Sequence, residues 1–305
     1  MPITIRFLGT SAAIPTSERG LPGIALKYNG TMVLFDCGED SQRALMQAGW
    51  KLSHLRVICI SHLHADHVGG LLGILTTREF QGIESPLTIL GPTGIKGFTE
   101  NILHFTYSHL NYPLEILELV GEGGVGYQGD DFSIHWAPLE HRVPTIGYLF
   151  VEHDKSGTFN VERAQRLGIP EGPLYGELKS GKDIRLSDGK MVEAKTMVGP
   201  SIPGRRIAVI WDTRPCPNAY RLADKTHLLI FDGTFTQLHH DEAEASDHCT
   251  AAQAAKIAKK ADARKLILTH ISARYQESEP ILQEAREIFA NSEVAVDGLE
   301  VIVER

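Results

Sequence analysis

Three histidines and one aspartate lie within six consecutive positions of this 305-residue chain. Imidazole and carboxylate side chains are the ligand set that suits zinc. The first two histidines are two positions apart and can reach one ion. The last two residues precede an apolar helical pattern and can reach a second ion. A cluster of merely exposed histidines explains this spacing less well, so we interpret it as a metal site formed by His62, His64, Asp66 and His67.

Three further candidate ligands each stand at the end of a strand-like apolar run. His141 follows the run at 132–140, Asp212 ends the run at 206–212, and His270 follows the run at 265–269. A strand end is where a rigid sheet can direct a side chain out of the core. Each residue alone would be an ordinary polar group at a strand terminus. One tetrahedral ion needs about four ligands and a two-metal site needs more, so these residues, taken together with the first cluster, favour a metal site over ordinary strand-end polar groups.

The elements that position these residues are read from hydrophobic periodicity. Helical patterns lie at 39–48, 67–79, 94–106, 248–263 and 279–290, and Asp247 or Thr250 is a plausible N-cap of the fourth. The chain is long enough for one large α/β domain or two small ones. We expect strands at 3–8, 23–28, 31–36, 57–61, 87–91, 132–138, 145–152, 206–212, 227–232, 265–269 and 299–303.

Residues 154–203 differ from the rest, because they are rich in glycine and proline and have weak apolar periodicity. A loop of this length inside a compact domain is usually functional or disordered. Residues 152–206 contain ten Lys or Arg and eight Asp or Glu, whereas the whole chain has a net charge of -8. A solvated surface of mixed charge would explain this difference. We expect a protruding insertion with two or three short elements of its own.

Composition and cysteine spacing limit the class of protein. No run approaches the ~18 apolar residues of a membrane helix, and the N-terminus enters a strand pattern without the features of a secretory signal. The net negative charge alone argues mildly against a nucleic-acid partner. The cysteines form no CxxC pair, which favours a reducing compartment, so we expect a cytoplasmic protein without membrane attachment. These cysteines are Cys37, Cys59, Cys216 and Cys249.

Motifs along nearly the whole chain resemble the metallo-β-lactamase superfamily, namely "SHLHADHVGGL" at 61–71, His141, "WDT" at 211–213 and "LTHIS" at 268–272. Other segments are similar to the short form of the tRNA 3′-processing endonuclease family, ribonuclease Z. They are "GTSAAIPTSER" at 9–19, "LGIPEGPLYGELKSG" at 167–181, "DTRPC" at 212–216, "DHCTAAQAAKIAKKA" at 247–261 and "THISARY" at 269–275. The glycine- and proline-rich segment and the last motif make the resemblance specific.

The resemblance implies a fold, an activity and an assembly. The fold is α/β, a four-layer αβ/βα sandwich in one domain over 1–305, with residues 154–200 as a protruding, flexible exosite arm that binds tRNA. The activity is a zinc-dependent endoribonuclease that removes the 3′ trailer from precursor tRNA. It leaves a 3′-hydroxyl on the tRNA and a 5′-phosphate on the trailer. The assembly is a homodimer in which the arm of one subunit serves the cut in the other.

The resemblance also implies two zinc ions per subunit. One would be held by His62, His64 and His141, the other by Asp66, His67 and His270, with Asp212 as a bridge. Two metals can stabilise both the attacking and the leaving oxygen of a phosphodiester displacement. Asp66 is implied as general base, and His248 as the group that stabilises the phosphorane or protonates the leaving oxygen. The implied substrate contacts are Arg19, Gly172, Pro173, Thr234 and Arg274.

The chain departs from the family pattern in several places, and the usual histidine of a His-Glu-Ala-Thr motif is missing. The loop at 15–20, which the family links to sensing the tRNA 3′ end, has Ser17 and Gly20 where lysine and asparagine are more usual around the arginine. Trp211 stands where glycine is more usual. Asp232, in "FDGTF", stands at the glutamate of a His-Glu-Ala-Thr motif. None of these differences removes an implied zinc ligand.

Three other functions fit part of the pattern. A related hydrolase could act on a small phosphodiester or another ester, but it would have no use for a distant RNA-binding arm. A non-enzymatic RNA-binding relative would not need seven intact ligands. An oxidoreductase on this fold would use iron and usually replaces a zinc histidine with a carboxylate, a change that this chain does not show.

Overall fold

The computed structural model describes residues 1–305, which form two compact units. The larger unit comprises Met1–Val151 and Arg205–Arg305, and the smaller one comprises Glu152–Gly204. No helix is both long enough and apolar enough to span a membrane.

The first sheet of the larger unit has seven strands in the order β18-β1-β3-β4-β5-β6-β7. Alternate residues of its strands face opposite sides, as the two-residue period of a strand requires. Val33 and Phe35 of β4 belong to one apolar cluster, and Met32 and Leu34 belong to another. Its strands are β1 (Ile3–Gly9), β3 (Gly23–Tyr28), β4 (Thr31–Phe35), β5 (Leu55–Cys59), β6 (Leu87–Gly91), β7 (Leu114–Glu118) and β18 (Glu300–Val303).

The second sheet also has seven strands, in the order β17-β15-β14-β13-β10-β9-β8. Its strands are β8 (Gly124–Gln128), β9 (Phe132–Leu139), β10 (Thr145–Glu152), β13 (Arg206–Ile210), β14 (Leu228–Asp232), β15 (Leu266–Thr269) and β17 (Ser292–Val294). A short parallel pair, β2 (Ser11–Ala12) with β16 (Ile271–Ser272), completes the unit.

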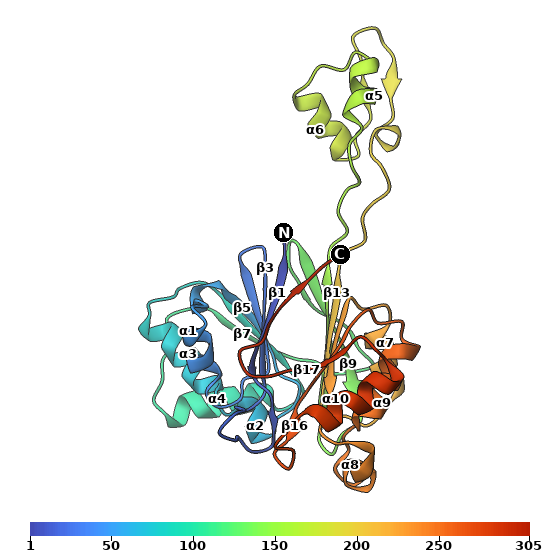
Figure 1. The fold of residues 1–305 in the computed structure, drawn as a ribbon. Coiled ribbons are helices and arrows are strands. Elements are labelled where there is room, and N and C mark those ends of the chain that lie inside the picture. The colour runs from blue at the N-terminus through green and yellow to red at the C-terminus, as the bar shows by residue number, and fades with distance from the viewer. The chain divides into compact units, whose positions relative to one another are not determined.

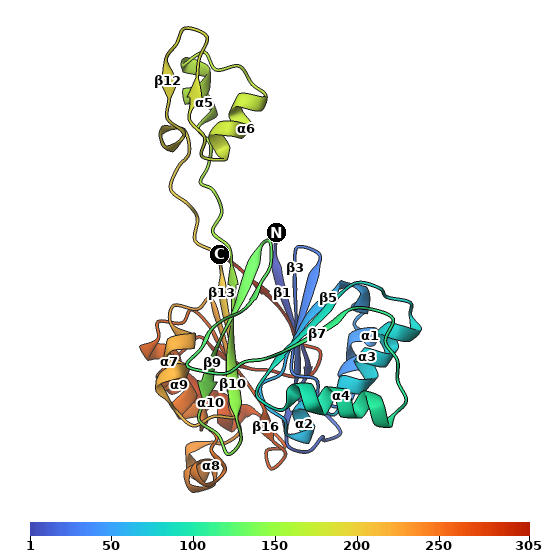
Figure 2. The same cartoon turned by 180° about the vertical axis from the view of Figure 1, so that it is seen from behind.

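The two sheets pack face to face, and helices cover both outer faces (Figures 1 and 2). One apolar cluster joins the inner faces and includes Phe7 and Phe150. A second apolar cluster joins the outer face of one sheet to its helices, and a third cluster does the same for the other sheet. The helices are α1 (Ser41–Gln47), α2 (Ala65–Val68), α3 (Leu71–Phe80), α4 (Ile95–Phe105), α7 (Pro217–Ala223), α8 (His240–Ser246), α9 (Ala251–Lys260) and α10 (Glu279–Ile288), with 3-10 turns η1 (Leu52–His54) and η3 (Gln237–His239). The expected four-layer αβ/βα sandwich is therefore confirmed.

Sheet topology directs the candidate ligands to one region. β4, β5 and β6 run parallel in one sheet, and β13, β14 and β15 run parallel in the other. Functional groups of open α/β sheets gather at the carboxyl ends of such strands. His62 follows β5, Asp212 follows β13, and His270 follows β15.

Some element boundaries differ from the expectation. The helix expected at 67–79 is two helices, α2 and α3, separated at Gly69 and Gly70. A Cβ atom on Gly70 would lie 2.3 Å from the carbonyl oxygen of Gly38, so the close approach of these two backbones requires glycine. The helix expected at 248–263 begins only at Ala251, where Thr250 forms a capping box with Gln253.

The smaller unit contains more regular structure than its composition suggests. Asn160 caps the first helix by accepting a hydrogen bond from the Arg163 N–H. An apolar cluster made only of residues of this unit includes Phe159, Tyr175 and Leu178. The elements are α5 (Val161–Arg166), α6 (Pro173–Lys179), β11 (Ile184–Arg185), β12 (Met191–Val192) and the 3-10 turn η2 (Ala194–Thr196).

Candidate metal centre and active site

The seven predicted ligands come together in two adjoining groups. In the first group, the ligand atoms of His62, His64, His141 and Asp212 lie within 4.8 Å of one another. Four nitrogen and oxygen donors match the coordination number of zinc. The second group, with the same spacing, consists of Asp66, His67 and His270.

Asp212 lies between the two groups. Its Oδ2 is 3.2 Å from His62 Nε2 and 3.1 Å from His67 Nε2, and its Oδ1 is 3.2 Å from His270 Nε2. Burial opposes the charge of this carboxylate, but the surrounding histidines hold its pKa well below the usual range. An ionised carboxylate in this position could act as a ligand in both groups of candidate metal ligands.

Two buried atoms at this centre have no hydrogen-bond partner, namely His141 Nε2 and Asp212 Oδ1. The contact of His270 Nε2 with Asp212 Oδ1 does not have the geometry of a hydrogen bond. An unsatisfied buried polar atom costs free energy, so each requires an explanation. A cation between these donors would satisfy both atoms, and the residues therefore fit a metal centre.

Hydrogen bonds outside the centre orient four of the candidate ligand histidines, including His62, whose Nδ1 lies 2.9 Å from Ser61 Oγ. His67 Nδ1 lies 2.6 Å from Asp36 Oδ2, and His141 Nδ1 lies 3.2 Å from the Asp247 carbonyl oxygen. His270 Nδ1 lies 3.0 Å from Thr234 Oγ1. When Nδ1 is engaged in this way, Nε2 is the nitrogen that remains for a metal.

Two other carboxylates near the centre already have full sets of partners. Asp36 accepts hydrogen bonds from the Ser61 N–H at 2.6 Å and the Ser61 hydroxyl at 2.5 Å, besides its contact with His67. Asp232 accepts from the Thr234 N–H at 2.9 Å and contacts His248 Nδ1 at 2.9 Å. These two residues therefore support the histidines and are not part of the candidate ligand set.

His248 adjoins the centre but is held by Asp232. Burial alone would lower the pKa of His248, but the charge of Asp232 and its hydrogen bond raise it to about 9. The ring of His248 stacks on that of His270, with centroids 5.4 Å apart. Because Asp232 occupies Nδ1, Nε2 is the nitrogen left for a substrate. Asp232, which stands at the glutamate of the His-Glu-Ala-Thr motif, thus supports His248.

A cavity of about 280 Å³ opens over the metal centre. Asp66, His248 and Thr234 line it, together with the backbone of the Ala12–Ala13 segment. Arg274 lies near its rim, because its guanidinium carbon is 4.9 Å from the ring centroid of Phe235, which also lines the cavity. The cavity is large enough for one phosphodiester group and its flanking atoms.

The remaining predicted substrate residues lie elsewhere. Arg19 donates hydrogen bonds to Thr10 Oγ1, the Ala295 carbonyl oxygen and Ser278 Oγ, and it does not line the cavity. Gly172 and Pro173 belong to the smaller unit, where they begin α6. Trp211 is buried edge-on to His67, with ring centroids 5.7 Å apart.

Sequence reasoning missed Asp36, although a signal was present. Like the predicted ligands, Asp36 directly follows an apolar strand, β4. It also shares a backbone feature with two of them. Asp36, Asp212 and His270 all have positive φ angles, of 52°, 52° and 59°. A positive φ angle is unfavourable for most residues other than glycine, and residues with such strained backbone conformations cluster at functional sites.

Comparisons with known proteins decide the family. A family model described as Anti-Pycsar protein Apyc1 matches residues 3–112. Ribonuclease Z of Bacillus licheniformis is 41% identical over 305 residues, which cover 98% of each chain. Ribonuclease Z of Gemmatimonas aurantiaca is 40% identical over 99% of this chain and 96% of that protein. The chain belongs to the ribonuclease Z family.

Solved structures agree with this membership. Human tRNase Z, short form, superposes with a TM-score of 0.73 at 25% identity, covering 99% of this chain and 100% of the human one. The metallo-β-lactamase fold protein YhfI from Bacillus subtilis has a TM-score of 0.69 at 16% identity, which shows the fold alone. The ribonuclease Z fold is thus present over the full length of the chain.

Proposed function

We propose that this ribonuclease Z family member is a zinc-dependent endoribonuclease that removes the 3′ trailer from precursor tRNA. The cut leaves a 3′-hydroxyl on the tRNA and a 5′-phosphate on the trailer. The observation that carries the proposal is full-length identity of about 40% to proteins named ribonuclease Z. The paired ligand groups in a cavity that fits a phosphodiester support it.

The donor atoms support two zinc ions per chain. His62, His64 and His141 would hold one ion, Asp66, His67 and His270 would hold the other, and Asp212 would be shared between them. When bound, such a pair of ions supplies a nucleophile at neutral pH and stabilises charge on the phosphate oxygens. The protein supplies fixed ligand positions, because the sheet ends and the outer hydrogen bonds set each side chain.

Two side chains handle protons in the proposed reaction. Asp66 lies at the cavity wall, where its carboxylate can accept the proton of the attacking water. His248 presents Nε2 to the cavity because Asp232 holds Nδ1, so it can donate a proton to the leaving 3′ oxygen. Asp232 is a positioning residue, since it acts through His248 and through Thr234, whose hydroxyl lies 3.0 Å from His270 Nδ1.

The smaller unit is proposed as the tRNA-binding arm, residues 154–200. Its lysines and arginines can contact phosphates, which gives affinity without reading sequence. Structured RNA is recognised mainly by shape, a task that suits a separately folded unit. We propose a homodimer for the active assembly, as the family resemblance implies.

The decisive experiment is cleavage of a 3′-extended tRNA precursor by the purified chain with zinc. Mapping of both ends should place one cut at the 3′ side of the acceptor stem, with the end groups stated above. A parallel reaction with bis-p-nitrophenyl phosphate tests the competing function of a small-phosphodiester hydrolase. Hydrolysis of that ester without any cleavage of the precursor would contradict the proposal.

A further inference from the structure

The loop of residues 13–20 touches the metal centre through a single backbone group. The Ala13 N–H donates a hydrogen bond of 3.0 Å to Asp66 Oδ2. Ala13 reaches this position because β2, which precedes it, pairs with β16, which directly follows His270. Its φ angle of 61° is unfavourable for alanine. Such a conformation persists only where the surroundings enforce it.

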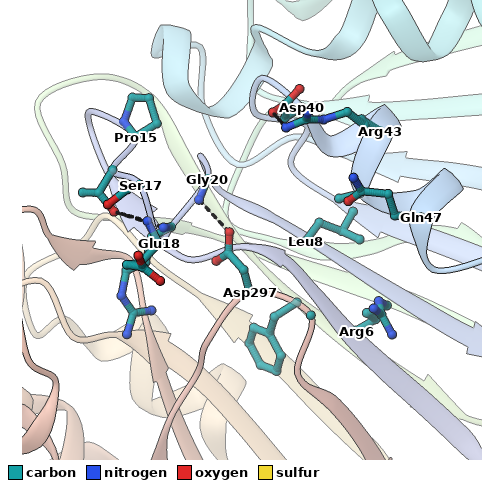
Figure 3. A pocket seen from close by; sticks show the side chains of 15 residues that line it. Arg6, Leu8, Pro15, Ser17, Glu18, Gly20, Asp40, Arg43, Gln47 and Asp297 are labelled. Atoms are coloured by element: carbon teal, nitrogen blue, oxygen red, sulfur yellow. Dashed lines mark hydrogen bonds and ion pairs between the residues drawn. The ribbon is translucent and has the colours of Figure 1, made fainter.

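The other end of the loop is tied to the body of the larger unit by the side chains of Thr10, Arg19 and Asp297, and Arg19 also donates to Ser278 Oγ. Asp297 accepts hydrogen bonds from the Thr10 hydroxyl and the Gly20 N–H, both at 2.6 Å. Arg19 donates to Thr10 Oγ1 at 2.5 Å and to the Ala295 carbonyl oxygen at 2.7 Å. Figure 3 shows Asp297 facing Gly20 at the base of the loop. We call Thr10, Arg19 and Asp297 the loop clamp.

Apolar packing cannot replace the loop clamp. A cavity of about 320 Å³ lies against the loop and is lined by Pro15, Ser17 and Arg43 (Figure 3). Ile14 is 60% exposed, so the one large apolar side chain of the loop tip is not buried. Within the loop, the Thr16 N–H donates to the Arg19 carbonyl oxygen, and at its base the Ser11 N–H of β2 donates to the Gly20 carbonyl oxygen. The loop is therefore a closed unit whose orientation depends on its polar base.

We propose that the loop clamp holds the Ala13 N–H on Asp66 Oδ2 and thereby fixes the orientation of the Asp66 carboxylate for phosphodiester hydrolysis. A carboxylate rotates easily about its last bond, and a donor fixed on one oxygen sets the direction of the other. Misplaced reacting groups lose rate steeply. Thr10, Arg19 and Asp297 are positioning residues here. The inference rests on the catalytic role proposed for Asp66.

The first test removes the Ala13 N–H by replacing Ala13 with lactic acid through nonsense suppression, which turns one amide into an ester and also weakens the Ala12 carbonyl oxygen as the acceptor of the Ile14 N–H. The same ester at exposed Ala290 is the matched control. With bis-p-nitrophenyl phosphate, kcat should fall about tenfold to a hundredfold, as expected for a hydrogen bond to a charged group. KM and bound zinc should not change. An ester at Ala13 with the parent kcat would overturn the proposal.

The second test loosens the base of the loop and does not depend on activity. Asp297→Ala should increase trypsin cleavage after Arg19 at least tenfold, in metal-free as well as zinc-loaded protein, measured under denaturing conditions as the amount of the fragment of residues 1–19. Glu300→Ala, in a nearby exposed carboxylate that pairs with Arg6, should cleave at the parent rate. Asp297→Asn keeps one acceptor and should fall between parent and Asp297→Ala in both cleavage and kcat.

The outcomes separate the clamp from the proposed function. Faster cleavage after Arg19 with a lowered kcat supports the clamp, whereas faster cleavage with the parent kcat, or no change in cleavage, overturns it. If Asp297→Ala fails to fold, as judged by circular dichroism, Asp297→Asn and the Ala13 ester decide. If the parent protein hydrolyses bis-p-nitrophenyl phosphate but does not cleave precursor tRNA, the proposed substrate is wrong. Both tests of the loop clamp would still be valid, because neither uses tRNA.

Discussion

At the scale of single residues, the candidate metal centre combines candidate ligands that can be recognised in the sequence with supporting residues that are harder to find there. His62, His64 and His67 can be recognised from the sequence because they lie within six consecutive residues. Asp36 was missed because its role depends on contact with His67, 31 positions later. The Ala13 N–H could not have been found, since every residue except proline has such a group and only the fold selects this one.

The first prediction concerns the ions. Purified protein in zinc-replete buffer should contain close to two zinc ions per chain by elemental analysis. Asp212→Asn should lose both, because its oxygens contact histidines of both groups, whereas His64→Ala should lose chiefly one. His109→Ala, in an exposed histidine of the same unit, is the control. Full occupancy in Asp212→Asn would contradict the bridging role.

The second prediction concerns proton transfer. His248→Ala should lower kcat by about 10²- to 10⁴-fold, the usual contribution of general acid catalysis, and should keep its zinc. Asp232→Asn should lower kcat less, because His248 remains but loses its charged partner. Glu244→Gln, an exposed change on neighbouring α8, should leave kcat unchanged. Single-turnover cleavage of precursor tRNA measures all three, and a parent rate in His248→Ala would refute its role.

At the scale of elements, most strands were predictable, including the edge strand β18, whereas the edge strands β7, β8 and β17 were missed. The expected strands correspond to β1, β3, β4, β5, β6, β9, β10, β13, β14, β15 and β18. Missed strands β7 and β8 are edge strands with exposed residues, so they lack the buried pattern that reveals a strand. The break between α2 and α3 also escaped prediction, because only the approach of Gly38 to Gly70 requires it.

The third prediction concerns the start of α9, directly after His248 and Cys249. Thr250→Ala removes the side chain that accepts the Gln253 N–H and should lower the free energy of unfolding by about 1–2 kcal/mol. Thr250→Ser keeps the cap oxygen and should lose less. Urea unfolding measures both. Equal stability of Thr250→Ala and the parent would show that α9 does not depend on its capping box.

At the scale of the whole molecule, the motifs and their order along the chain were sufficient to predict the fold. They identify the family, and members of a family share the long-range topology of their sheets. The structure of the smaller unit was underestimated, since its apolar cluster is assembled from scattered residues without periodicity. The homodimer and the cytoplasmic location stay predictions. Mass measurement in solution would test the first of these.

The last prediction separates RNA binding from chemistry by removing the arm. Lys155 and Ile202 form a reciprocal pair of backbone hydrogen bonds, at 2.9 and 2.8 Å, so a two-residue Asn-Gly turn can replace residues 156–201. The metal centre should survive, because every candidate ligand belongs to the larger unit. Zinc content and hydrolysis of bis-p-nitrophenyl phosphate should therefore stay near the parent values, whereas KM for precursor tRNA should rise at least tenfold. Binding must be compared at one salt concentration, because phosphate contacts weaken steeply with salt. A deletion variant that folds, holds zinc and binds precursor tRNA as tightly as the parent would show that the arm is not the RNA-binding unit.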